Sequence, residues 1–179
     1  MKWLTILTVL LMLGCSQQSQ QLSTNEIEQI KKTIIERTNK LAQDLKDLNY
    51  PEIMTFYANI EDYILSGDGY YWGDYKTTDG IWHDFTKGVK KVQKWDFYNY
   101  KVHVFSKDVA YCFVEFDHER GIENTTKGHG CFAFSMQKID GDWKAVTVHV
   151  THNFGVYHEN GEVRKWWLKY SPENRKEQE

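Results

Sequence analysis

Two side chains on one predicted strand have residue types and a spacing that suit chemistry. His149 and Thr151 alternate within the segment 142–153, so a strand there places both on one face. An imidazole beside a hydroxyl is the combination that a general base or an anion receptor requires. The alternative is a histidine that hydrogen-bonds to the backbone at the end of a sheet. The residues alone leave both interpretations open.

Glu115 is the candidate acid. It falls on a strand predicted over 109–118 and shares a face with Tyr111 and Phe113. On the concave face of a curved sheet this carboxyl would be buried and its pKa raised, which suits proton transfer near neutral pH. On the convex face it would be a solvated strand residue, the commoner environment of a glutamate. The candidate catalytic pair is therefore His149 with Glu115.

The sequence predicts no metal site and no cofactor. His149 and His152 diverge to opposite faces of one strand, and the spacing of the three cysteines matches no zinc motif. Cys112 and Cys131 lie on neighbouring predicted strands, so they are either a cross-strand disulfide, if they pair directly, or two buried thiols. The glycines within 67–73 miss the spacing of a dinucleotide-binding loop.

The residues that carry this chemistry must be positioned by helices in the first half of the chain. Ser23 opens a capping box, and an apolar stripe then continues to Leu48, which predicts a first helix. Pro51 suits the first turn of a second, shorter helix. A third helix is expected to be capped by Asp84 and to end near Trp95.

Strands follow the helices. A short strand is expected around 60–66, and from Phe97 onward apolar residues recur with a period of two. Hairpin signals separate four further strands, expected at 97–106, 109–118, 128–139 and 142–153. Helices first and strands later predict an α+β domain in which the helices pack on one face of a curved antiparallel sheet.

Three segments, taken in order, resemble SnoaL-like members of the nuclear transport factor 2-like superfamily. They are VFSKDVA at 104–110, DGDWK at 140–144, and the final His149-Val150-Thr151. Many of these proteins have a serine where this chain has Thr151, which keeps a hydroxyl. The resemblance covers 23–153. It implies a cone-shaped, cystatin-like fold whose wide end opens into a pocket.

Several aromatic residues of this chain would lie around such a pocket. Tyr63, Trp72 and Trp82 come from segments that would rim or floor the cone, where their rings could stack on a flat apolar ligand. Thr151 would add a hydroxyl to the same ligand site, and each ring could equally belong to an ordinary core. The superfamily includes isomerases, hydrolases, cyclases and assembly domains, so its fold does not name a function.

The N-terminus is predicted to be an export signal. Lys2 precedes an apolar run that is too short to span a bilayer as a helix. The residues MLGC at 12–15 resemble a bacterial lipobox, which implies cleavage before Cys15 and lipidation of its thiol. An ordinary signal followed by an incidental cysteine is the alternative. Ser16, directly after the cysteine, resembles a signal for the outer membrane.

These features divide the chain into four parts: a signal peptide at 1–14, a lipidated cysteine with its tether at 15–22, the SnoaL-like domain at 23–153, and a C-terminal extension with a polar tail at 154–179. The expected location is the bacterial cell envelope, with a lipid anchor in the outer membrane and the domain facing the periplasm or the cell surface.

The composition limits the kinds of partner that the protein can bind. The 22 basic and 25 acidic side chains leave a net charge of −3, which offers no basic surface for nucleic acid, and 15% of the residues are aromatic. The leading hypothesis is a membrane-anchored domain that binds a small apolar or aromatic molecule, or a partner, in its cone, without assured catalysis. One alternative is an enzyme of isomerase, hydrolase or cyclase type that uses His149 and a pocket acid. Another is an assembly domain that forms a homodimer.

Overall fold

The computed structural model describes residues 22–121 and 125–152. The predicted signal peptide, Cys15 with almost all of its tether, and the extension at 154–179 lie outside the described residues and stay predictions. Within the described ranges, no helix combines the length and the apolar character needed to cross a membrane.

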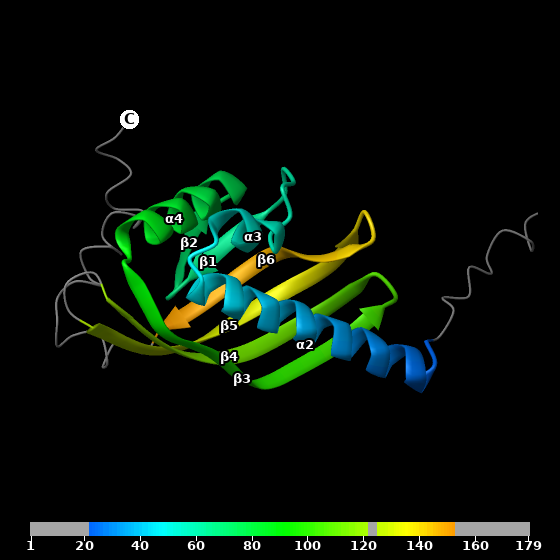
Figure 1. The fold of residues 1–179 in the computed structure, drawn as a ribbon. Coiled ribbons are helices and arrows are strands. Elements are labelled where there is room, and N and C mark those ends of the chain that lie inside the picture. Colours follow the sequence, from blue (N-terminus) through cyan, green and yellow to red (C-terminus); the bar gives the residue numbers. More distant parts are fainter. Residues whose placement is uncertain (1–21, 122–124, 153–179) are drawn as a thin grey trace, which may run out of the picture.

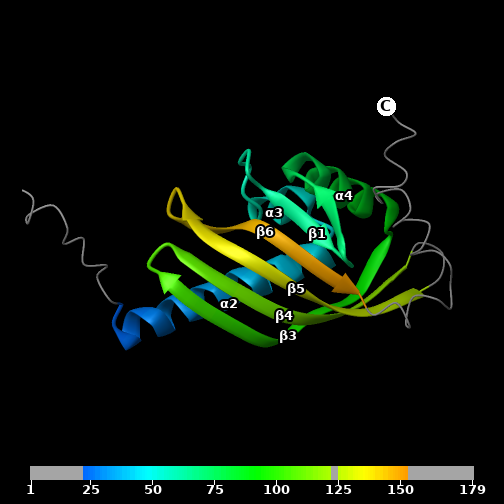
Figure 2. The same ribbon diagram turned by 180° about the vertical axis from the view of Figure 1, so that it is seen from behind.

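The first helix begins where the sequence predicts. α2 spans Thr24–Lys46, and the Ser23 hydroxyl accepts a hydrogen bond from the backbone N–H of Glu26. The Glu26 carboxylate in turn accepts a hydrogen bond from the backbone N–H of Ser23 at 2.8 Å, which completes the capping box. Its apolar stripe is buried, including Ile34, Leu41 and Leu45. Figures 1 and 2 show this helix lying across one face of the sheet.

The second helix confirms its prediction, whereas the third is displaced. α3 spans Tyr50–Thr55 with proline in its first turn. α4 spans Tyr75–Gly88, so the predicted helix from Asp84 to Trp95 is wrong. The cap is Asp74, whose Oδ1 accepts a hydrogen bond from the backbone N–H of Thr77 at 3.0 Å.

A β-bulge explains this error. Val92 and Trp95 both lie in a strand, and both are buried although they are three residues apart. Val92 pairs with Arg120 and Lys94 pairs with Glu119, so the intervening residue is inserted into the ladder. Because of the inserted residue, the next buried side chain comes three residues after Val92 instead of two. A spacing of three is typical of a helix, which explains the wrong prediction.

Six strands form one curved sheet in the order β2-β1-β6-β5-β4-β3. β1 pairs with β6 in parallel and every other pair is antiparallel. The helices lie on the concave side, which confirms the α+β prediction (Figures 1 and 2). The strands are β1 Ile64–Gly67, β2 Tyr70–Gly73, β3 Lys91–Ser106, β4 Val109–Gly121, β5 Thr125–Ile139 and β6 Asp142–His152.

A second bulge, in β6, decides which side chains reach the concave face. Met136 of β5 pairs with Ala145, whereas Ser135 pairs with Thr147, so Val146 is the extra residue. Val146 lies at the point where the edge of β6 that faces away from β5 exchanges one hydrogen-bonding partner for another. Before it, Ala145 exchanges hydrogen bonds with the chain around Phe56; after it, Thr147 pairs with β1.

Two glycines should respond in opposite ways to alanine. Gly80 lies inside α4, and a Cβ there would meet no atom within 4 Å. We expect Gly80→Ala to stabilise the protein by roughly 0.5–1 kcal/mol, because alanine loses less backbone entropy in a helix. At Gly67 a Cβ would lie 2.5 Å from the Trp72 ring and 2.5 Å from the Val150 carbonyl oxygen. Gly67→Ala should therefore destabilise the protein by about 1–3 kcal/mol.

Urea denaturation of both variants measures these changes. A loss of stability in Gly80→Ala would contradict the placement of this residue on an open helical surface. An unchanged midpoint in Gly67→Ala would contradict the close approach of β1, β2 and β6.

Candidate functional site

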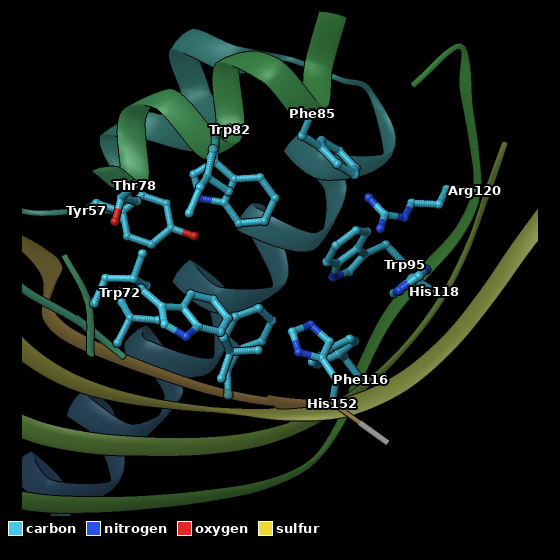
Figure 3. A pocket seen from close by; sticks show the side chains of 15 residues that line it. Tyr57, Trp72, Thr78, Trp82, Phe85, Trp95, Phe116, His118, Arg120 and His152 are labelled. Atoms are coloured by element: carbon cyan, nitrogen blue, oxygen red, sulfur yellow. The ribbon is translucent and has the colours of Figure 1, made fainter. Parts of the chain in front are cut away.

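A cavity lies between α4 and the concave face of the sheet, with a volume of about 60 Å³ (Figure 3). Most of its lining is aromatic or aliphatic, and a few polar groups lie among the rings. The lining residues are Tyr57, Leu65, Trp72, Thr78, Ile81, Trp82, Phe85, Trp95, Phe116, His118, Arg120, Phe132, Val148, Val150 and His152.

One side of the cavity is an aromatic wall. Trp82 of α4 stacks on Tyr57 with ring centroids 6.3 Å apart. Burial raises the pKa of the Tyr57 hydroxyl well above its usual value, and the polar interaction with the Trp82 side chain offsets part of this rise. Trp72 of β2 lies on the same side of the cavity in Figure 3. The predicted ligand-binding residues Trp72 and Trp82 therefore do line a cavity. That they bind a ligand stays a prediction.

The other side is a stack of rings from β3 and β4. His118 stacks on Trp95 with centroids 5.1 Å apart and on Phe116 at 6.0 Å. Burial, reinforced by the positive charge of Arg120, lowers the pKa of His118 from 6.5 to about 2. This imidazole is therefore neutral at physiological pH. The Arg120 guanidinium lies over the Phe85 ring, 5.1 Å from its centroid.

A histidine held by an aspartate lies at the floor of the cavity. His152 Nδ1 lies 2.9 Å from Asp68 Oδ2, and Asp68 Oδ1 accepts a hydrogen bond from the His152 backbone N–H at 2.8 Å. Their side chains are 13% and 6% exposed. An ionised carboxylate only accepts, so Nδ1 carries the proton and the lone pair of a neutral ring is on Nε2. Figure 3 shows the imidazole pointing into the cavity.

Trp95 brings a polar atom to the same space. Its side chain is 4% exposed, and its indole Nε1 has no hydrogen-bond partner among the residues that the structure describes. In Figure 3 the ring borders the cavity above His152. The cavity therefore combines an apolar lining with an imidazole and an indole N–H.

The prediction that placed His149 and Thr151 in the pocket is wrong. Because Val146 is inserted, Val148, Val150 and His152 turn to the concave face, and the residues between them turn outward. His149 Nδ1 lies 3.0 Å from the Ser66 hydroxyl, and Nε2 lies 3.3 Å from the Thr151 hydroxyl, all on the convex side.

Glu115 also leaves the site. It is on the convex face of β4, where its carboxylate accepts a hydrogen bond from the Asn99 side chain at 3.1 Å. The candidate pair of His149 and Glu115 therefore cannot act in the cavity. Tyr63 does not line the cavity either: it is 2% exposed and accepts a hydrogen bond from the Thr78 hydroxyl at 3.1 Å.

The cysteines on the sheet are not bridged. β4 and β5 pair Cys112 with Phe134 and Cys131 with Glu115, so the direct pairing that a disulfide needs does not occur. Both thiols are free; Cys112 is buried, and burial raises its pKa to about 11. Across residues 22–121 and 125–152, no group of three or more potential ligands could hold a metal ion.

The sequence carried a signal for His152 that the alternation argument missed. Trp143 and Ala145 mark the buried face in the first half of β6, but Val148 and Val150 mark it in the second half. The apolar period therefore shifts by one between them, which is the sign of a bulge. Counting from Val150 instead of from Trp143 places His152 on the concave side.

Comparisons with known proteins find similarity at the level of structure. No protein-family model matches the chain, and no curated protein matches it either. A "putative scytalone dehydratase" from Novosphingobium aromaticivorans superposes with a TM-score of 0.65 at 12% identity, covering 73% of this chain and 89% of that one. A "putative dehydratase from the NTF2-like family" from Streptomyces avermitilis gives 0.63 at 7% identity, covering 70% and 97%. A ketosteroid isomerase-like protein from Erwinia carotovora atroseptica gives 0.55 at 13% identity, covering 68% and 94%.

These similarities confirm the fold that the three motifs predicted. The chain has the nuclear transport factor 2-like fold, with N-terminal helices over a curved, unclosed sheet. Identities of 7–13% to these structures establish the fold alone.

Proposed function

We propose that this nuclear transport factor 2-like domain binds a small, largely apolar molecule of about one ring in the cavity under α4. The observation that carries the proposal is the lining itself, in which aromatic rings surround a few convergent polar groups. Ligand sites of proteins have this composition, because apolar walls supply affinity and a few polar groups set orientation.

The volume limits the size of the ligand. A water molecule needs roughly 10–15 Å³ of such space, and an apolar cavity of about 150 Å³ holds benzene. The cavity of about 60 Å³ is partly open to solvent. A single ring therefore fits if the side chains of α4 move slightly outward or if one end of the ligand projects through the opening. A fused polycyclic molecule is too large.

Nuclear magnetic resonance tests this proposal directly. The chain has seven tryptophans, and each indole N–H gives a separate signal in a ¹⁵N-labelled sample. Toluene and acetophenone should shift the signals of Trp82 and Trp95 in a saturable way. Val150→Phe fills the cavity from β6 and should abolish the shifts while the protein remains folded. Binding that survives in Val150→Phe, or no saturable shift with either probe, would refute the proposal.

A specific observation favours a second function, proton-transfer catalysis. Asp68 fixes one nitrogen of His152, and the ring points into the cavity as a general base must. Two structures with this fold are named dehydratases and a third is named ketosteroid isomerase-like. Dehydration and isomerisation both require a positioned base, so a reaction of this type on a small ring fits the site.

Membrane attachment through Cys15 is a separate proposal that rests on the MLGC sequence at 12–15. We expect Cys15→Ser to eliminate metabolic labelling with radioactive palmitate in a bacterial host and to leave the uncleaved precursor. Cys131→Ser is the matched control, because it also removes one exported thiol and should label normally. Equal labelling of Cys15→Ser and the unmodified chain would contradict a lipid anchor.

Self-association is the remaining proposal on partners. Large apolar side chains are exposed where β3 and β4 meet: Phe105 is 65%, Val109 40% and Tyr111 37% exposed. Such a cluster is typical of a contact surface. Sedimentation of the protein, with Phe105→Lys as the comparison, distinguishes a homodimer from a monomer.

A further inference from the structure

We infer that the ligand of this cavity presents a carbonyl-type oxygen to the indole N–H of Trp95, so its class is a small cyclic or aromatic ketone or a related carbonyl compound. This inference rests on the proposed binding function. It adds the identity of one functional group on the ligand and names the residue that selects it.

The indole N–H of Trp95 is a buried donor that needs an acceptor. The residue is 4% exposed, and its Nε1 lacks a hydrogen-bond partner in the part of the chain that the structure describes. Buried donors in native proteins are nearly always satisfied, and an exception calls for an explanation such as a ligand. Trp82, on the opposite wall, differs because its side chain has the Tyr57 hydroxyl as a polar neighbour, which lowers the pKa of that hydroxyl. Among the tryptophans that line the cavity, Trp95 is the one whose buried indole nitrogen is without a hydrogen-bond partner in the described residues.

Trp95 cannot turn to find a partner elsewhere. Its ring stacks on Phe116 at 5.9 Å and on His118 at 5.1 Å. The rings of Phe85 and Trp82 contact it edge-on at 5.7 and 6.2 Å. Rings packed from both walls hold the indole in one orientation. A fixed donor of this kind selects for the position of an acceptor as well as for its presence.

The chemistry of the indole group decides which acceptor suits it. The indole N–H is a single neutral donor that cannot accept. A carbonyl oxygen needs only one such donor to be satisfied when it enters an apolar site. A hydroxyl oxygen can also accept this hydrogen bond, but it brings an additional donor that the indole cannot accept. The apolar walls formed by residues such as Val148 and Phe132 then enclose the hydrocarbon part of the ligand.

The test compares two molecules of the same shape, acetophenone and α-methylstyrene. In α-methylstyrene a methylene group replaces the carbonyl oxygen of acetophenone. Dissociation constants are measured for the unmodified protein and for Trp95→Phe, which keeps a ring but has no donor. The ratio of the two affinities should shift against acetophenone by about 2- to 12-fold in Trp95→Phe, the equivalent of one hydrogen bond. The indole proton signal of Trp95 should move downfield with acetophenone only.

Trp143→Phe is the matched control, because Trp143 is a buried tryptophan of β6 that does not line the cavity. Its affinity ratio should equal that of the unmodified protein. If both molecules bind and Trp95→Phe leaves their ratio unchanged, the inference is refuted and cavity binding stands; a water molecule on Nε1 would give this result. If neither molecule binds, the proposed function itself fails and the inference falls with it.

Discussion

His152→Gln should reduce proton-transfer activity in the cavity by about 10²–10⁴-fold, the usual contribution of a positioned general base. The measurable reaction is hydrogen–deuterium exchange of the methyl protons of acetophenone in deuterated buffer, followed by proton resonance. Glutamine keeps a side-chain N–H that can still bond to Asp68, but it has no basic nitrogen to direct into the cavity. Binding of acetophenone should therefore change much less than its exchange rate.

Two further variants make this result specific. Asp68→Asn removes the carboxylate that keeps the proton on Nδ1, and it should lower the exchange rate in the same direction as His152→Gln. His149→Gln is the matched control, since its ring lies on the convex face beside the Ser66 hydroxyl. Exchange that is insensitive to His152→Gln, or equally sensitive to His149→Gln, would exclude His152 as the base and leave the domain as a binding protein.

The contrast between these two histidines shows how far the sequence determines the site. Alternation correctly predicts that His149 and His152 lie on opposite faces of β6. It does not predict which face is concave, because one inserted residue at Val146 exchanges the faces for the rest of the strand. The helix capped at Ser23 is local in origin and was predictable for that reason, since all the groups that define it lie within one turn.

The partner of His152 depends on long-range pairing. Asp68 is 84 residues away in sequence, and the two meet because β1 runs parallel to β6 and ends in the turn that holds Asp68. Parallel pairing of strands so far apart leaves no local pattern. The same holds for Trp95, whose neighbouring rings come from α4 and from β4. The sequence therefore predicts an aromatic pocket, but not which polar groups enter it.

His118 should make the stability of the protein strongly dependent on pH. Its pKa is about 2 in the folded state, because burial and the nearby Arg120 disfavour the charged ring, and it returns to the ordinary value of 6.5 on unfolding. Between these two values the unfolded chain binds a proton that the folded chain does not. Stability therefore rises with pH through this window and is fully present only above pH 6.5. Lowering the pH from about 7 to about 5 should cost about 2 kcal/mol from this group alone.

The experiment isolates this contribution by difference. Urea denaturation from about pH 7 to about pH 5 gives the free energy of unfolding of the unmodified protein and of His118→Phe, which can still stack on Trp95 and Phe116. All other titrating groups are common to both proteins. The difference between their free energies of unfolding should therefore change by about 2 kcal/mol in favour of His118→Phe as the pH falls. Phe116→Leu removes a buried neighbour without removing a titrating group, so it should be less stable at every pH with an unchanged slope. A free-energy difference for His118→Phe that is constant with pH would mean that the folded and unfolded chains bind the same number of protons at this residue, so that burial does not lower the pKa of His118.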